Sequence, residues 1–142
     1  MSAAKYRVLK QVFGYDSFRP GQETLVDSLL SGRDTMGIMP TGAGKSICFQ
    51  VPGILLPGIS LVISPLISLM RDQVNALVQA GVRGAFLNSS LTLGQYRKAL
   101  YNARQGMYKI IYVAPERLLT PEFLDFAKSA NISMVCVDEA HC

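Results

Sequence analysis

Cysteine and histidine are scarce in this 142-residue chain, which has three cysteines and one histidine. The cysteines, Cys48, Cys136 and Cys142, are widely spaced and form no C-x-x-C pair, so they predict no disulfide framework. A structural zinc site needs four ligands at short spacings, and His141 is the only histidine, so zinc is not expected either. Unpaired thiols are typical of a reducing compartment, and we therefore expect a cytoplasmic protein.

Charged side chains are also few, at 17% of the chain, whereas hydrophobic side chains make up 49%. This composition excludes disorder, and the length is enough for one domain with a sizeable core. The 14 Lys and Arg outnumber the 10 Asp and Glu, which gives a formal net charge of +4. Such a modest basic excess permits a polyanionic partner, such as nucleic acid or a nucleotide, but does not select one.

No segment of the chain has the pattern of a secretory signal or a membrane span. The first 14 residues mix basic and apolar side chains without a long apolar stretch. Residues 47–70 carry no charge, which is long enough to suggest a membrane helix, but three prolines interrupt them: Pro52, Pro57 and Pro65. These prolines predict a helix end, a turn and a short buried strand instead, and no membrane partner is expected.

Short apolar runs alternate with amphipathic stretches along the rest of the chain, as in βα units. The expected strands span residues 35–39, 59–63, 85–87, 109–113 and 132–137. The expected helices span residues 3–13, 21–30, 66–80, 93–103 and 121–128, and another begins at 44–45. The predicted fold is therefore α/β, a doubly wound and mainly parallel sheet, whose ligands bind where strands end.

A glycine-rich loop follows the first expected strand and has the character of a phosphate-binding loop. Gly42 and Gly44 let successive backbone N–H groups converge on phosphate oxygens, and the following helix adds its positive end. Lys45 would pair with the β- and γ-phosphates, and the Ser46 hydroxyl would bind Mg²⁺. Met39 stands where the usual pattern has its first glycine. The predicted nucleotide-binding residues here are Thr41, Gly42, Ala43, Gly44, Lys45 and Ser46.

Two adjacent carboxylates, Asp138 and Glu139, follow the last expected strand, and His141 comes two residues later. Asp138 would hold Mg²⁺ through water, and Glu139 would orient and deprotonate an attacking water. Acidic residues after a strand are often only helix caps. Together with the upstream loop, however, they supply the second half of a nucleotide-hydrolysing site.

Five ordered segments resemble the motifs of the RecQ-type DNA helicases of helicase superfamily two. Residues 13–22 resemble its adenine-recognition motif, and residues 39–46 resemble motif I, including the non-glycine first position. Residues 64–73 resemble motif Ia, residues 112–118 motif Ib, and residues 138–142 motif II, a DEAH box. The resemblance spans almost the whole chain and implies a RecA-like motor lobe whose ligands are ATP and Mg²⁺.

The resemblance implies roles for residues that spacing alone leaves open. Gln22 would hydrogen-bond the adenine edge while Tyr15 and Arg19 stack on its faces. His141 would couple the nucleotide state to DNA binding. The implied contacts to single-stranded or duplex DNA are those of Ser64, Pro65, Arg71 and Arg117. By their local pattern, Ser64 and Pro65 also predict the N-cap and the first residue of the next helix.

Family members continue far beyond residue 142, so we expect a fragment that ends at motif II. The expected domain is a partial first motor lobe over 1–142, with N-terminal helices and the adenine motif in 1–33. A second lobe and accessory domains would be missing, and such a fragment, expected to be monomeric, should not unwind DNA. The resemblance further implies 3′-to-5′ unwinding in DNA recombination and repair, in the bacterial nucleoid or in a eukaryotic nucleus.

Other functions remain open at this point. A phosphate-loop nucleotide kinase or related transferase would use the acidic pair for Mg²⁺-assisted phosphoryl transfer to a small acceptor. A non-catalytic module that binds ATP or nucleic acid would show salt-dependent binding without hydrolysis. A helicase acting on RNA is a third possibility, because backbone contacts scarcely distinguish the two nucleic acids.

Overall fold

The structure is a computed structural model that describes residues 2–32 and 45–137. The expected strand at 35–39, the glycines of the phosphate-binding loop and the acidic motif at 138–142 lie outside these residues. The chain divides into two compact units, residues 1–56 and residues 57–142, here called the N-terminal and the C-terminal unit. Each unit is described by itself.

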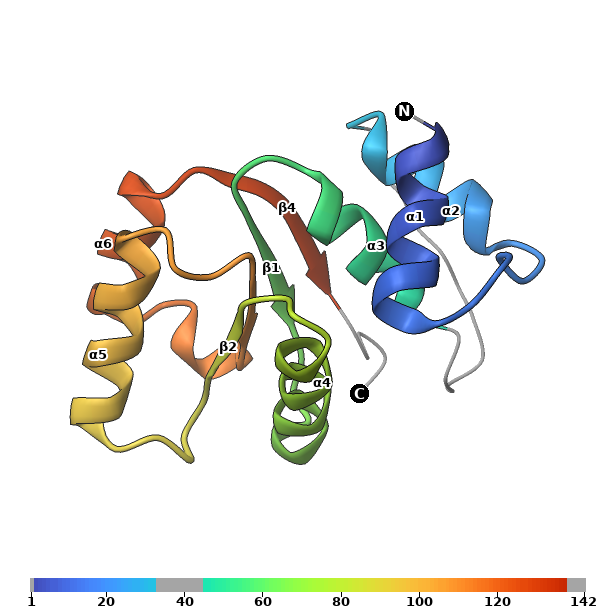
Figure 1. The fold of residues 1–142 in the computed structure, drawn as a ribbon. Helices are drawn as coiled ribbons and strands as arrows, with labels where there is room; N and C mark the ends of the chain where they lie inside the picture. The colour runs from blue at the N-terminus through green and yellow to red at the C-terminus, as the bar shows by residue number, and fades with distance from the viewer. Residues whose placement is uncertain (1, 33–44, 138–142) are drawn as a thin grey trace. The chain divides into compact units, whose positions relative to one another are not determined.

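The described part of the N-terminal unit is helical (Figure 1). Its helices are α1 (Ser2–Phe13), α2 (Gln22–Leu30) and α3 (Ile47–Leu55), and α3 packs against both others. α3 is apolar on all sides and buried over most of its length. It runs three residues past Pro52 and ends at Leu55, so the helix end predicted for this proline-containing run falls just before Pro57. The core of the unit consists of Leu9, Val26, Ile47 and Val51.

The C-terminal unit contains a parallel sheet of four strands in the order β2-β3-β1-β4. The strands are β1 (Ile59–Ile63), β2 (Gly84–Leu87), β3 (Ile110–Val113) and β4 (Ile132–Val137). Between them run α4 (Ile67–Gln79), α5 (Leu93–Arg104), the short 3₁₀ helix η1 (Pro115–Arg117) and α6 (Pro121–Ser129). The predicted α/β class with parallel strands is confirmed, and η1 is the one described element that the sequence pattern did not predict.

Helices cover both faces of this sheet. On one face, Leu61 of β1 and Ile111 of β3 join Tyr96 of α5 and Phe126 of α6 in the main hydrophobic cluster. Alternate strand residues point to opposite faces, so the side chain of Tyr112 lies on the other face. There its hydroxyl donates a hydrogen bond to the Gln73 side chain of α4. The central strands β1 and β3 are thus buried on both sides, which explains their continuous apolar sequence.

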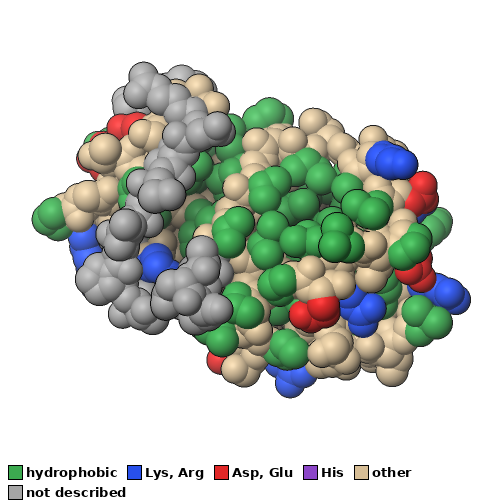
Figure 2. All heavy atoms as spheres, turned by 180° about the vertical axis from the view of Figure 1, so that it is seen from behind, with side chains coloured by type: hydrophobic (Ala, Val, Ile, Leu, Met, Phe, Trp, Pro, Cys, Tyr) green, Lys and Arg blue, Asp and Glu red, His purple; other side chains and the backbone are tan. Residues whose placement is uncertain are grey.

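β4 keeps part of its apolar surface open. Val135 and Val137, which lie on one side of the strand, are 56% and 60% exposed, whereas Met134, on the other side of the strand, is buried. Figure 2 shows that hydrophobic side chains gather on one face of the molecule. Among the described helices, none is long and apolar enough to cross a membrane. The exposed Val135 and Val137 side chains belong to the surface of the sheet.

Candidate functional site

The loop after α1 carries the first residue expected at the adenine. α1 ends because Gly14 adopts a φ of 78°, in the left-handed region that favours glycine. The Gly14 N–H donates to the Lys10 carbonyl at 3.0 Å, and the Tyr15 N–H donates to the Leu9 carbonyl at 3.2 Å. These bonds satisfy the last carbonyls of the helix and leave Tyr15 44% exposed. The Tyr15 ring is thus accessible for stacking.

Residues 19–22 form a type II β-turn that leads into α2. The Gln22 N–H donates to the Arg19 carbonyl at 3.0 Å, with Pro20 and Gly21 at the two central positions. Gly21 has φ 87° and ψ −22°, a conformation that this turn requires and that a side chain would strain. The Pro-Gly pair therefore sets the direction in which the chain enters α2.

Gln22 is held more tightly than the sequence suggested. Its side chain is only 1% exposed, and its Oε1 accepts a hydrogen bond from the Arg19 N–H at 2.7 Å. This hydrogen bond links the last residue of the turn to the first through the Gln22 side chain, and it fixes the orientation of the Gln22 amide. Arg19 is exposed beside it.

Lys45 and Ser46 lie immediately before α3, where backbone N–H groups at a helix start favour anions. The Ser46 carbonyl accepts from Phe49 N–H and Gln50 N–H at 3.2 and 2.9 Å, so the helical bonding pattern begins at this residue. The Ser46 hydroxyl makes no capping hydrogen bond. A hydroxyl oxygen is a ligand of the hard kind that Mg²⁺ prefers, so Ser46 fits the predicted Mg²⁺ contact. Thr41, Gly42, Ala43 and Gly44 lie outside the described residues.

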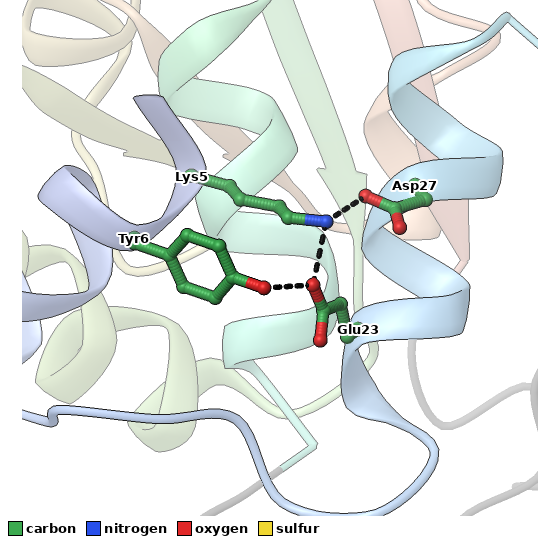
Figure 3. A network of polar contacts seen from close by, with 4 residues as sticks. All are labelled: Lys5, Tyr6, Glu23 and Asp27. Carbon is green, nitrogen blue, oxygen red and sulfur yellow. Dashed lines mark hydrogen bonds and ion pairs between the residues drawn. The ribbon is translucent and has the colours of Figure 1, made fainter. Parts of the chain in front are cut away.

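An ion-pair network that the sequence did not reveal joins α1 to the first turns of α2 (Figure 3). The Lys5 side chain, 4% exposed as a residue, places its Nζ 2.7 Å from Glu23 Oε2 and 2.6 Å from Asp27 Oδ1. The Tyr6 hydroxyl donates to the same Glu23 carboxylate. Hydrogen bonds to Asp27 and Glu23 raise the pKa of Lys5, and the bond from Lys5 lowers the pKa of Glu23.

The residues expected to contact DNA lie in the C-terminal unit, where parallel strands end at a common edge. Ile63 pairs with Val113, so the segments that follow β1 and β3 start side by side. These segments contain Ser64 and Pro65 after β1 and Arg117 in η1 after β3. Pro65 and Arg71, the latter on α4, are exposed. The structure therefore places the starts of the motif Ia-like and motif Ib-like segments side by side.

Ser64 is not the N-cap of the next helix, and Pro65 is not its first residue. The Ser64 N–H donates to the Val113 carbonyl at 3.1 Å, which continues the pairing of β1 with β3 by one residue. The Ser64 hydroxyl accepts from the Leu66 N–H at 3.3 Å. Leu66, with ψ 97°, occupies the cap position, and α4 begins at Ile67. The sheet ladder thus prevails over the local capping pattern, and Ser64 is 1% exposed.

Arg117 packs against a neighbouring aromatic ring. Its guanidinium carbon lies 4.5 Å from the centroid of the Tyr96 ring, and Tyr96 itself is 1% exposed. The Tyr96 hydroxyl lies 3.3 Å from Thr120 Oγ1, which donates to the Arg117 carbonyl at 2.7 Å. Arg117 Nε is buried and has no hydrogen-bond partner within the described part of the chain. Arg117, which was expected to add charge toward DNA, therefore stacks on Tyr96 within the fold.

A polar segment after β2 was missed at the sequence level. Asn88 is fully buried, accepts a hydrogen bond from Ser90 N–H at 2.9 Å and donates to Met70 Sδ of α4 at 3.5 Å. The polar run Asn-Ser-Ser directly after an apolar strand is the sequence feature that could have predicted this segment. Asp138, Glu139 and His141 lie outside the described residues, and over residues 2–32 and 45–137 no cluster of His, Cys, Asp or Glu could hold a metal ion.

Comparison with known proteins identifies the family of this chain. Residues 19–142 match the family described as DEAD/DEAH box helicase. The chain is 46% identical over 135 residues to the ATP-dependent DNA helicase RecQ of Haemophilus influenzae, which covers 95% of this chain and 22% of that protein. It is 43% identical over 136 residues to the ATP-dependent DNA helicase RecQ of Bacillus subtilis, covering 95% of this chain and 23% of that protein.

A plant relative shows the same pattern. The ATP-dependent DNA helicase Q-like 5 of Arabidopsis thaliana is 47% identical over 137 residues, covering 96% of this chain and 15% of that protein. The chain thus spans between 15% and 23% of the length of these relatives. The parallel sheet, the turn that ends at Gln22 and the match over residues 19–142 agree with the sequence resemblance, and the chain belongs to the DEAD/DEAH box helicase family.

Proposed function

We propose that this chain is the ATP-binding part of an ATP-dependent DNA helicase that couples ATP hydrolysis to strand separation in recombination and repair. The observation that carries the proposal is the similarity over 95% of the chain to proteins named ATP-dependent DNA helicase RecQ. The position of Lys45 and Ser46 directly before the nine-residue helix α3 supports it, because a helix N-terminus favours phosphate. Unwinding in the 3′-to-5′ direction, a monomeric state and a cytoplasmic location are parts of the same proposal.

Within this function each candidate residue has a defined task. Lys45 binds the β- and γ-phosphates, and Ser46 and Asp138 hold Mg²⁺, which neutralises phosphate charge when it is bound. Glu139 orients the attacking water and accepts its proton, and His141 relays the nucleotide state to DNA. Gln22 reads the adenine edge.

DNA contacts are assigned to the edge where β1 and β3 end. Backbone N–H groups and hydroxyls at strand and helix ends bind phosphate without reading base sequence. Pro65 and Arg71 are exposed there or one turn beyond, whereas Ser64 is buried and Arg117 is stacked on Tyr96. We therefore assign the charged contact to Arg71 first.

Binding of a fluorescent ATP analogue with Mg²⁺ to the full chain tests the nucleotide part. We expect saturable binding that Lys45→Ala weakens by at least about tenfold, the effect of losing a charge-assisted phosphate contact. Gln22→Ala should weaken binding less and should reduce the preference for adenine. Lys98→Ala, which removes an exposed charge of α5, is the matched control. Circular dichroism checks that each variant folds.

Two results would contradict the proposal. A folded chain without saturable binding, or equal binding by Lys45→Ala and the unaltered chain, would exclude an ATP site at α3. The transferase alternative is separated by turnover assays on a protein extended to the length of the relatives. Stimulation of ATP hydrolysis by single-stranded DNA supports a helicase, whereas phosphoryl transfer to a small acceptor without DNA stimulation supports a transferase.

A further inference from the structure

Lys5 is a buried cation in the middle of α1, far from the predicted catalytic motifs in the sequence. The relative exposure of its side chain is 6%, and those of its partners, Glu23 and Asp27, are 41% and 54%. Burying an ammonium group is unfavourable unless its charge is paired and hydrogen-bonded. The Lys5 ammonium therefore requires both carboxylates to remain at their present positions on α2.

The two carboxylates come from one face of α2. Glu23 and Asp27 are four residues apart, so their side chains lie one helical turn apart and Lys5 Nζ contacts both, as Figure 3 shows. Two contacts from different turns fix both the axial position and the rotation of α2 relative to α1, which one contact would not do. The ion-pair network is thus a geometric constraint on the beginning of α2.

The beginning of α2 is also where Gln22 lies, directly before Glu23 in the chain. The Tyr6 hydroxyl donates to the Glu23 carboxylate, and the Tyr6 ring packs against Phe18 with 5.7 Å between ring centroids. Phe18 directly precedes the Arg19–Gln22 turn. Neighbouring residues of α1 therefore hold the turn on both sides, through Phe18 before it and Glu23 after it.

We propose that Lys5 is a positioning residue for adenine recognition, which acts by clamping the first turn of α2 so that Gln22 presents its amide in one orientation. The inference rests on the proposed ATP-binding function. Because Lys5 acts on the base-reading residue, its loss should weaken the discrimination between adenine and guanine nucleotides. A general loss of stability would instead lower the affinity for ATP and GTP alike.

The test measures the binding of fluorescent ATP and GTP analogues to the full chain and compares the ratio of the two affinities. Lys5→Met should lower the ATP-to-GTP affinity ratio by about fivefold, a size typical of residues that are coupled through one hydrogen-bond and ion-pair network. Lys5→Arg, which can still contact both carboxylates, should restore most of the ratio. Arg7→Met removes a cation from the exposed side of the same helix and should leave the ratio unchanged.

Gln22→Ala separates failure of this inference from failure of the proposed function. If Gln22→Ala does not lower the ratio, adenine reading by Gln22 is wrong and the role of Lys5 falls with it. If Gln22→Ala lowers the ratio and a folded Lys5→Met does not, only the positioning role is wrong. The double variant should have the same ratio as Gln22→Ala, and an additive loss would also overturn the inference.

Glu23→Gln keeps the test decisive if Lys5→Met does not fold. This change removes the negative charge of one partner on the half-exposed side of the network and leaves the Asp27 carboxylate in contact with Lys5. It should lower the ATP-to-GTP ratio in the same direction by a smaller factor. An unchanged ratio in folded Glu23→Gln would overturn the positioning role.

Discussion

Arg117 offers a sharp test of how far a motif residue serves packing instead of DNA binding. Its guanidinium lies 4.5 Å from the centroid of the buried Tyr96 ring, and its backbone carbonyl accepts from Thr120 Oγ1 at 2.7 Å. Arg117→Met removes the charge and the planar group but keeps most of the apolar stem. Arg117→Lys keeps the charge and removes the planar group. The two variants therefore separate charge from stacking.

The structure sets the expected magnitude. A cation over an aromatic face contributes about 0.5–1 kcal/mol at exposed sites and about 2 kcal/mol where it is desolvated. Arg117 is half-buried with a buried Nε, which places it toward the upper part of that range. We expect Arg117→Met to lower the free energy of unfolding by about 1–2 kcal/mol. Arg117→Lys should lose about 1 kcal/mol, because an ammonium cannot stack as a guanidinium does.

Thermal and urea unfolding measure these losses, and binding of fluorescent single-stranded DNA at several salt concentrations measures the charge contribution. Arg71→Met is the matched control, because Arg71 is exposed on α4 and its loss should change stability by less than about 0.5 kcal/mol. The packing role is refuted if Arg117→Lys is as stable as the unaltered chain. It is equally refuted if Arg117→Met lowers only DNA affinity and its salt dependence.

Two further predictions concern stability. Gly58→Ala should cost about 3–4 kcal/mol, because strain at φ 80° adds to a collision of the new Cβ with the Asn131 carbonyl oxygen at 2.5 Å. Gly81→Ala, at φ 91° with nothing within 4 Å, should cost only about 1 kcal/mol, and urea unfolding that ranks the two equally would contradict this. The raised pKa of Lys5 stabilises the fold below its ordinary value of 10.5, and this gain is lost as pH rises through the raised pKa. The lowered pKa of Glu23 stabilises it above 4.5, and this gain is lost as pH falls through the lowered pKa. The stability difference between Lys5→Met and the unaltered chain should thus be constant at neutral pH and shrink at both extremes in a pH series of unfolding curves.

Most of the C-terminal unit was predictable because its strands are short, apolar and free of charge. The runs at 59–63 and 132–137 form strands with the predicted bounds, and the weak run at 85–87 forms a strand one residue longer. A strand covered on both faces requires such a sequence, as in β1 and β3, whereas the equally apolar β4 keeps Val135 and Val137 exposed. Helix bounds were predicted to within about two residues for the same reason, since amphipathic periodicity reports the buried face.

The predictions that failed concern competition between local and long-range bonds. Ser64 and Pro65 have the local pattern of a helix start, but the Ser64 N–H is taken by Val113 of a strand far along the chain. The contacts of Lys5 and Arg117 depend on tertiary packing between distant residues and leave no periodic trace in the sequence. Such contacts become visible only when the helices are placed side by side.

The predicted adenine-recognition motif shows how local backbone geometry is specified by the sequence while its tertiary support is not. Gly14 and Gly21 both adopt positive φ, so one glycine ends α1 and the other turns the chain into α2. Tyr15, between the two glycines, is exposed. Gln22, directly after Gly21, is buried, and its side-chain oxygen accepts a hydrogen bond from the Arg19 N–H. The two glycines and the proline thus explain the spacing of the motif through backbone geometry. The motif does not specify the rotation of α2 about its axis. That rotation is constrained by the ion pairs of Lys5, a buried residue of α1 that lies outside the motif, with Glu23 and Asp27.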